Sequence, residues 1–197
     1  MKKICVYCGS SPGRTPEYID CARVLSKELV RRNIGLVYGG ASVGIMGEIA
    51  NTVLNAGGEV VGIIPQSLVD KEVSHNGLTE LKVVNSMHER KAIMAEISDG
   101  FIALPGGLGT IEELFEVLTW SQLGFHKKPC ALLNIKQYYN GLSLFLDHAV
   151  EEQFIKSIHR EMLLVEDDPS KLLDAMETYN PPSVDKWIGR NKQNPAK

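Results

Sequence analysis

Long apolar runs and a surplus of positive charge are both missing from this 197-residue chain. No stretch approaches the roughly 20 consecutive apolar residues that a membrane-spanning helix needs. The formal net charge is -3, whereas proteins that bind nucleic acids usually carry a basic surplus that meets the phosphates. The sequence therefore predicts neither a membrane partner nor a nucleic-acid partner, and it leaves room for a small basic pocket that binds one phosphate.

Cysteine is also scarce, at Cys5, Cys8, Cys21 and Cys130. The basic N-terminus precedes an apolar run of only Ile4–Cys8, which is shorter than the roughly 7 to 15 residues of a signal-peptide core. Without a secretory signal, we expect reduced thiols and a cytoplasmic location. The single C-x-x-C pair lies inside the first predicted strand and the histidines lack ligand spacing, so we expect no metal site.

Short β-branched runs alternate with longer helical patterns along the chain. The predicted strands are Lys3–Cys8, Ile34–Tyr38, Glu59–Ile64, Leu81–Val84, Gly100–Leu104, Pro129–Asn134 and Met162–Val165. Between them lie stretches with apolar residues at i, i+3 and i+4, of which Tyr18–Arg31 is an example. Strands that are apolar on both faces and separated by helices indicate a doubly wound α/β fold, a parallel sheet of about seven strands covered on both faces.

The length fits one domain, which we predict to span residues 1–179. Residues 180–197 are rich in Pro, Lys and Asn and are predicted to form a loosely attached C-terminal tail. The connection Pro65–Thr79 is long and polar, and such loops often carry function.

Three glycine-rich turns follow predicted strands, at Cys8–Gly13, Tyr38–Gly47 and Leu104–Glu113. In a parallel sheet with right-handed crossovers, all three emerge at the same edge. Glycine lets a phosphate approach the backbone closely, and the helix that follows offers free N–H groups. Each turn alone could simply be a tight connection. Together they predict an anion site, although the chain has no G-x-x-x-x-G-K-[ST] motif.

Two elements near these turns carry charged side chains that can be interpreted in two ways. Thr110 and Glu113 match the T-x-x-E capping box, so Glu113 is interpreted as a helix cap or as a catalytic carboxylate. The two roles are not exclusive, since either places Glu113 in the first turn above the loop. Arg90 and Lys91 stand near a predicted helix start, where cations oppose the macrodipole. They belong either to a solvated charged turn, which Glu89 helps to satisfy, or to a site that binds an anion or a carboxylate.

The stretch MHERKAIMAEISDGFIALPGGLGTIEELFEVLTW resembles the LONELY GUY family of cytokinin riboside 5′-monophosphate phosphoribohydrolases. Members of this family often carry the label of lysine decarboxylases. The resemblance extends over almost the whole chain and includes VYCGSS, YGGASVGIMG and WSQLGFHKKPCALLN. It implies a Rossmann-like homodimer that hydrolyses the N-glycosidic bond of adenine-type nucleoside 5′-monophosphates to free base and ribose 5-phosphate.

By position, the resemblance implies that Arg90 and Glu113 form the catalytic pair. The substrate-binding residues that it implies are Glu72, Lys91, Gly106, Gly107, Leu108, Gly109, Thr110, Ile111, Glu112 and Thr119. Ser10 and Ser11 in the first glycine-rich turn are candidates for a further phosphate contact. No cofactor is expected, because no lysine stands out as a pyridoxal Schiff base. The resemblance leaves open whether AMP or an N6-prenylated relative is preferred.

A glycosidic cleavage of this kind develops positive charge on the ribose. We assign to Glu113 the stabilisation of that charge and the orientation or deprotonation of the attacking water. Arg90 would hold the carboxylate by a two-pronged contact, keep it ionised, or bind a ribose hydroxyl. The alternative function is a non-catalytic binding protein of the same fold, either a molybdenum-cofactor carrier or a nucleotide sensor.

Overall fold

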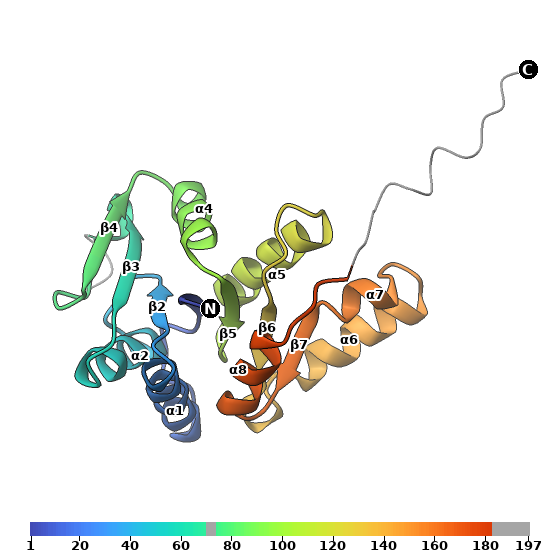
Figure 1. Ribbon diagram of the computed structural model, residues 1–197, viewed down its shortest axis with the longest axis horizontal. Coiled ribbons are helices and arrows are strands. Elements are labelled where there is room, and N and C mark those ends of the chain that lie inside the picture. Colours follow the sequence, from blue (N-terminus) through green and yellow to red (C-terminus); the bar gives the residue numbers. More distant parts are fainter. Residues whose placement is uncertain (70–73, 183–197) are drawn as a thin grey trace, which may run out of the picture.

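The computed structural model describes residues 1–69 and 74–182 and contains a seven-stranded sheet in which all strand pairs are parallel (Figure 1). The strands are β1 (Lys3–Tyr7), β2 (Gly35–Tyr38), β3 (Val60–Pro65), β4 (Glu80–Val84), β5 (Gly100–Ala103), β6 (Cys130–Leu133) and β7 (Leu163–Glu166). Every predicted strand is present, with ends that differ by at most one residue. Glu72 and residues 183–197 of the predicted tail lie outside the described residues.

Helices cover both faces of the sheet, which confirms the doubly wound α/β prediction (Figure 1). They are α1 (Glu17–Arg31), α2 (Gly44–Asn55), α3 (Gln66–Val69), α4 (Met87–Ile97), α5 (Leu108–Gln122), α6 (Asn140–Glu151), α7 (Ser157–Arg160) and α8 (Pro169–Glu177), with a 3₁₀ turn η1 (Ile135–Gln137). One core lies under α1, α2 and α8, and the other under α4, α5 and α6. None of the described helices combines the length and apolarity needed to cross a bilayer.

Strand character follows from burial. In β1, β2, β5 and β6 nearly every residue is buried, as expected for central strands that are apolar on both faces. The strand β4 differs, because Leu81 and Val83 are 36% and 48% exposed. It lies at one end of the sheet. The sequence could not distinguish this edge strand from the central ones.

The strand order is β4-β3-β2-β1-β5-β6-β7, so the order in which strands are added to the sheet reverses between β1 and β5. The loops after these two strands therefore lead away to opposite sides, and in open α/β sheets this is the place where ligands bind. Here the two loops touch, because the Gly9 N–H donates to the Pro105 carbonyl at 3.2 Å. The connection through α4 returns the chain from the edge strand β4 to the centre at β5, and α4 packs against β3 and β1 on the way.

Candidate active site

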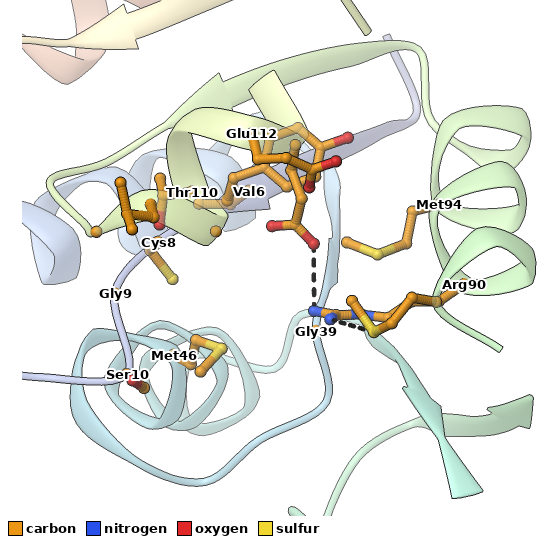
Figure 2. A pocket seen from close by; sticks show the side chains of 16 residues that line it. Val6, Cys8, Gly9, Ser10, Gly39, Met46, Arg90, Met94, Thr110 and Glu112 are labelled. Carbon is orange, nitrogen blue, oxygen red and sulfur yellow. Dashed lines mark hydrogen bonds and ion pairs between the residues drawn. The ribbon is translucent and has the colours of Figure 1, made fainter. Parts of the chain in front are cut away.

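A cavity of about 330 Å³ opens at the carboxyl edge of the sheet, above the reversal between β1 and β5 (Figure 2). It is lined by Val6, Tyr7, Cys8, Gly9, Ser10, Gly39, Met46, Met87, Arg90, Met94, Gly107, Leu108, Gly109, Thr110, Glu112 and Glu113. All three predicted glycine-rich turns contribute to this lining. Their convergence at one edge is therefore confirmed.

Arg90 and Glu113 face each other across this cavity. The Arg90 Nη2 atom lies 3.4 Å from the Glu113 Oε1 atom, and the two side chains are only 11% and 12% exposed. Arg90 comes from the first turn of α4 and Glu113 from α5, so the contact joins two helices (Figure 2). Arg90 Nε and Glu113 Oε1 are both buried and make no hydrogen bond to the described protein atoms. Buried polar atoms without a hydrogen bond are rare in proteins, and their presence in this pair is typical of a functional site.

Burial raises the pKa of Glu113 above its ordinary value, and the nearby charge of Arg90 opposes this rise. Glu112 and Glu116 raise the pKa further, whereas Lys91 lowers it. A carboxyl group whose pKa is shifted by burial and by one specific partner, and which lies in a cleft, is a strong candidate for acid-base or electrostatic catalysis.

The capping-box interpretation of Glu113 is wrong. The helix α5 begins at Leu108 and its N-cap is Gly107, so Thr110 is its third residue and Glu113 its sixth. Glu113 therefore lies in the second turn rather than the first. Thr110 packs against the backbone of Gly106, where an added Cβ would overlap the threonine hydroxyl. The tertiary contact between the loop and the helix sets the helix start, and it leaves the Glu113 carboxylate facing the cavity.

A capping arrangement does exist on α4, where the sequence analysis missed it. The Ser86 hydroxyl accepts a hydrogen bond from the Glu89 N–H at 3.1 Å, and the Glu89 Oε2 accepts one from the Asn85 N–H at 2.8 Å. The S-x-x-E pattern at Ser86–Glu89 was the signal that could have located this helix start. It fixes the first turn of α4, from which Arg90 projects.

The interpretation of Arg90 and Lys91 as a solvated charged turn is also wrong, because both side chains are largely buried. Lys91 Nζ lies 2.6 Å from Glu112 Oε1 and 3.0 Å from Glu116 Oε1. Both cations of α4 therefore bind carboxylates of α5. Lys91 does not line the cavity.

The other predicted substrate-binding residues are only partly brought together. Gly107, Gly109, Thr110, Glu112 and Ser10 line the cavity, as does Leu108, which is 92% exposed at its rim. Ile111 instead packs against the hydrophobic core under α5. Gly106 lies in the glycine-rich loop but does not line the cavity, and its backbone packs against Thr110. Ser11 lies outside the lining, and its hydroxyl accepts a hydrogen bond from the Gly13 N–H at 3.3 Å. Thr119 lines a second pocket between α5, α6 and α7.

Several lining residues were not predicted from the sequence. Gly39 lies against Arg90, since an added Cβ at this position would overlap the guanidinium. Met46, Met87, Met94 and Leu108 give the lining its larger apolar side chains, and Figure 2 shows Met46 and Met94 extending from α2 and α4. Methionine side chains are adaptable and make favourable contacts with aromatic rings. Met87 stands one helical turn from Arg90, and this spacing could have identified it.

Within residues 1–69 and 74–182, no group of three or more His, Cys, Asp or Glu side chains is arranged to hold a metal ion.

Comparison with known proteins identifies close relatives. A family model described as "Possible lysine decarboxylase" matches residues 46–176. The cytokinin riboside 5′-monophosphate phosphoribohydrolase LOG1 of Arabidopsis thaliana is 51% identical over 92% of this chain and 85% of its own length. The corresponding enzyme LOG7 of the same plant is 49% identical over 92% of this chain and 83% of its own length.

Solved structures with a similar fold are more distant in sequence. The molybdenum cofactor carrier protein of Chlamydomonas reinhardtii aligns with a TM-score of 0.67 and 22% identity, over 89% of this chain and 96% of that one. The molybdenum cofactor binding protein of Rippkaea orientalis aligns with a TM-score of 0.68 and 21% identity, over 90% and 96% of the two chains. At these identities the likeness shows the fold alone.

Replacing Arg90 with Met should make the stability of the protein depend more strongly on pH. Because the folded-state pKa of Glu113 is raised above 4.5, stability is lost as the pH rises from the unfolded-state pKa through the folded-state pKa. Removing Arg90 raises that pKa further and widens the pH range over which stability is lost. We expect Arg90→Met to unfold with a free energy close to that of wild type near pH 4 and about 3 kcal/mol lower near pH 8.

Urea denaturation at both pH values measures this difference. Arg23→Met is the matched control, because Arg23 forms exposed ion pairs with Asp20 and Glu48. Its effect should stay below about 1 kcal/mol at either pH. A destabilisation by Arg90→Met that is the same at both pH values would contradict the prediction.

Proposed function

The chain belongs to the family of cytokinin riboside 5′-monophosphate phosphoribohydrolases, and from this membership we propose how its cavity acts on a nucleotide. It is a hydrolase of N-glycosyl compounds that splits a nucleoside 5′-monophosphate into free base and ribose 5-phosphate. The assignment of this chemistry to the cavity is supported by the buried Arg90–Glu113 pair, which lies beside a glycine-rich helix N-terminus. We propose AMP and its N6-substituted relatives as the substrates.

Glu113 acts on the anomeric carbon. Its carboxylate stabilises the positive charge that develops on the ribose and orients or deprotonates the attacking water. Arg90 makes one contact to this carboxylate, at 3.4 Å, rather than a two-pronged one. We therefore assign to Arg90 the other two roles, which are to keep Glu113 ionised against the effect of burial and to bind a ribose hydroxyl through its remaining N–H groups.

The 5′-phosphate binds at the start of α5. The N–H groups of the first helical turn have no partner inside the helix, and the macrodipole adds positive potential there. A Cβ at Gly107 or Gly109 would meet only open space, so the backbone at both positions is accessible from the cavity. Ser10 completes this subsite from the turn after β1.

The base lies against the apolar side chains of Met46, Met87 and Met94, with Leu108 at the rim. A flat purine ring packs well against thioethers. An apolar N6 substituent would extend towards the mouth of the cavity, where Leu108 and Met87 are 92% and 40% exposed.

We further propose that two copies of the chain form a dimer through the surface around the second pocket, of about 190 Å³. Phe154 and Phe145 are 89% and 63% exposed and are chain neighbours of the pocket residues Ile155 and Leu146. Large apolar side chains that are this exposed beside a pocket support an interface, because contiguous exposed apolar surface usually marks one. Thr119 lies in this pocket, so a contribution of Thr119 to substrate binding would be made across the interface.

The four free thiols fit a cytoplasmic location.

Incubating the pure protein with AMP should release free adenine and ribose 5-phosphate, detected by chromatography. Because the phosphate anchors the sugar, adenosine should be hydrolysed at least about 100-fold less efficiently. The hydrolysis of N6-isopentenyl-AMP, measured in parallel, shows whether the side chains of Met46, Met87 and Met94 accommodate the apolar isopentenyl group. Equal rates with AMP and adenosine would overturn the phosphate subsite, and a failure to release any base would overturn the assignment as a hydrolase.

Glu113→Gln should remain folded and lose about 100- to 1000-fold in the rate of AMP hydrolysis, since it removes the charge that stabilises the transition state. Glu151→Gln is the matched control, because Glu151 is exposed at the end of α6. Circular dichroism checks the fold of both variants. Near-wild-type turnover of the Glu113 variant would refute its catalytic role.

Sedimentation analysis should give twice the mass of a single chain, and Phe154→Glu should shift the protein towards the monomer because it places a charge in the apolar contact. Val24→Glu introduces the same charge on α1, where Val24 is 53% exposed, and should leave the dimer intact. A wild-type protein that sediments as a monomer at all concentrations is incompatible with the proposed interface.

A further inference from the structure

The segment between β6 and α6 adopts a backbone conformation that its side chains disfavour. Lys136 and Gln137 have φ angles of +52° and +60°, in the left-handed region that residues other than glycine seldom occupy. Two such residues in succession persist only where the surroundings hold them in place. Backbone strain of this kind often accompanies a functional constraint.

Three contacts hold this segment. The Asn134 Oδ1 atom accepts a hydrogen bond from the Tyr139 N–H at 2.7 Å. Lys136 Nζ lies 2.6 Å from the Glu17 Oε1 atom at the start of α1. The ring of Tyr138 packs edge-on against that of Tyr18, with 5.9 Å between the centroids.

With this conformation, two adjacent tyrosines reach the loop before α5, where we propose that the phosphate binds. The Tyr139 hydroxyl donates to the Leu104 carbonyl at 2.6 Å, and the Tyr138 hydroxyl donates to the Gly106 carbonyl at 2.7 Å. These two carbonyls flank Pro105, immediately before α5 begins. Tyr139 is 2% exposed and belongs to the core, whereas Tyr138 is 46% exposed and lies at the surface.

The contact of Tyr138 fixes the orientation of one peptide group. In a trans peptide the C=O and the following N–H point in opposite directions. When the Gly106 carbonyl is directed at Tyr138, the Gly107 N–H is directed to the other side. Gly107 lines the cavity, whereas Tyr138 does not. Gly107 is also the N-cap of α5, where N–H groups lack partners within the helix.

Gly106 packs against Thr110, but the other side of this peptide is open, because Gly107 carries no side chain and the space beside it is empty. The hydroxyl of Tyr138 therefore supplies a constraint that the loop itself lacks. An anion site works best when its donors are already aimed before the ligand arrives, because no reorganisation is then needed. We propose that Tyr138 is a positioning residue of the phosphate subsite, whose hydroxyl holds the Gly106 carbonyl and thereby directs the Gly107 N–H at a bound phosphate monoester.

This proposal rests on the proposed function only for the identity of the substrate. Tyr138→Phe tests it, because the ring that packs against Tyr18 is kept and only the hydroxyl is lost. The affinity for ribose 5-phosphate, measured by calorimetry, should fall about five- to tenfold, the usual effect of losing one hydrogen bond. With AMP as substrate, KM should rise by a similar factor and kcat should change less than about twofold.

Tyr179→Phe is the matched control, because its hydroxyl is buried and makes no hydrogen bond to the described protein atoms. It should bind ribose 5-phosphate as wild type does. The proposal is overturned if Tyr138→Phe binds ribose 5-phosphate within twofold of wild type, if the control is weakened equally, or if kcat falls while KM is unchanged. It is also overturned if the wild-type protein does not bind ribose 5-phosphate.

These outcomes separate the proposal from the function on which it draws. If the wild-type protein binds ribose 5-phosphate but hydrolyses no AMP, the proposed function fails. A weakened affinity of Tyr138→Phe under those conditions would still support its positioning role.

Discussion

The burial of one ion pair between two helices organises this site. Removing an arginine and a glutamate from water costs free energy that their mutual attraction returns only partly, and a single contact at 3.4 Å is not the geometry that maximises the return. Arg90 and Glu113 are therefore poorly explained as a device for stability. They are better explained as largely buried charged groups beside a cavity, where their interactions with a substrate are screened less than in bulk water.

The topology of the sheet makes this pairing possible. The chain builds β1 to β4 outward, then returns through α4 to place β5 beside β1. This return brings the start of α4 to the same edge as the loop that begins α5. Lys91 joins the same two helices a second time, through its contacts with Glu112 and Glu116. Gly39 completes the arrangement by leaving room for the Arg90 guanidinium.

Local patterns predicted the fold well, because strand and helix periodicity and glycine positions are local properties. The seven strands and the meeting of three glycine-rich turns follow from them. The position of Glu113 within α5 did not, because the T-x-x-E pattern is local whereas the helix start at Leu108 depends on packing of Thr110 against Gly106. The contact between Tyr138 and Gly106 could not be predicted either. The two residues are 32 positions apart, and the contact depends on a left-handed backbone at residues other than glycine, which no local pattern indicates.

One helix carries both the proposed phosphate subsite and the proposed catalytic acid. Gly107 to Thr110 form its start, and Glu113 follows in the second turn. Because a helix is rigid over such a span, a phosphate fixed at its N-terminus places the attached sugar at a set distance from the carboxylate. Binding energy gained at the phosphate is then available to orient the anomeric carbon. A loop built of glycines has few side chains that fix its backbone N–H groups, so a contact from outside the loop is needed to keep them directed at the phosphate, and the surface hydroxyl of Tyr138 is placed to supply it.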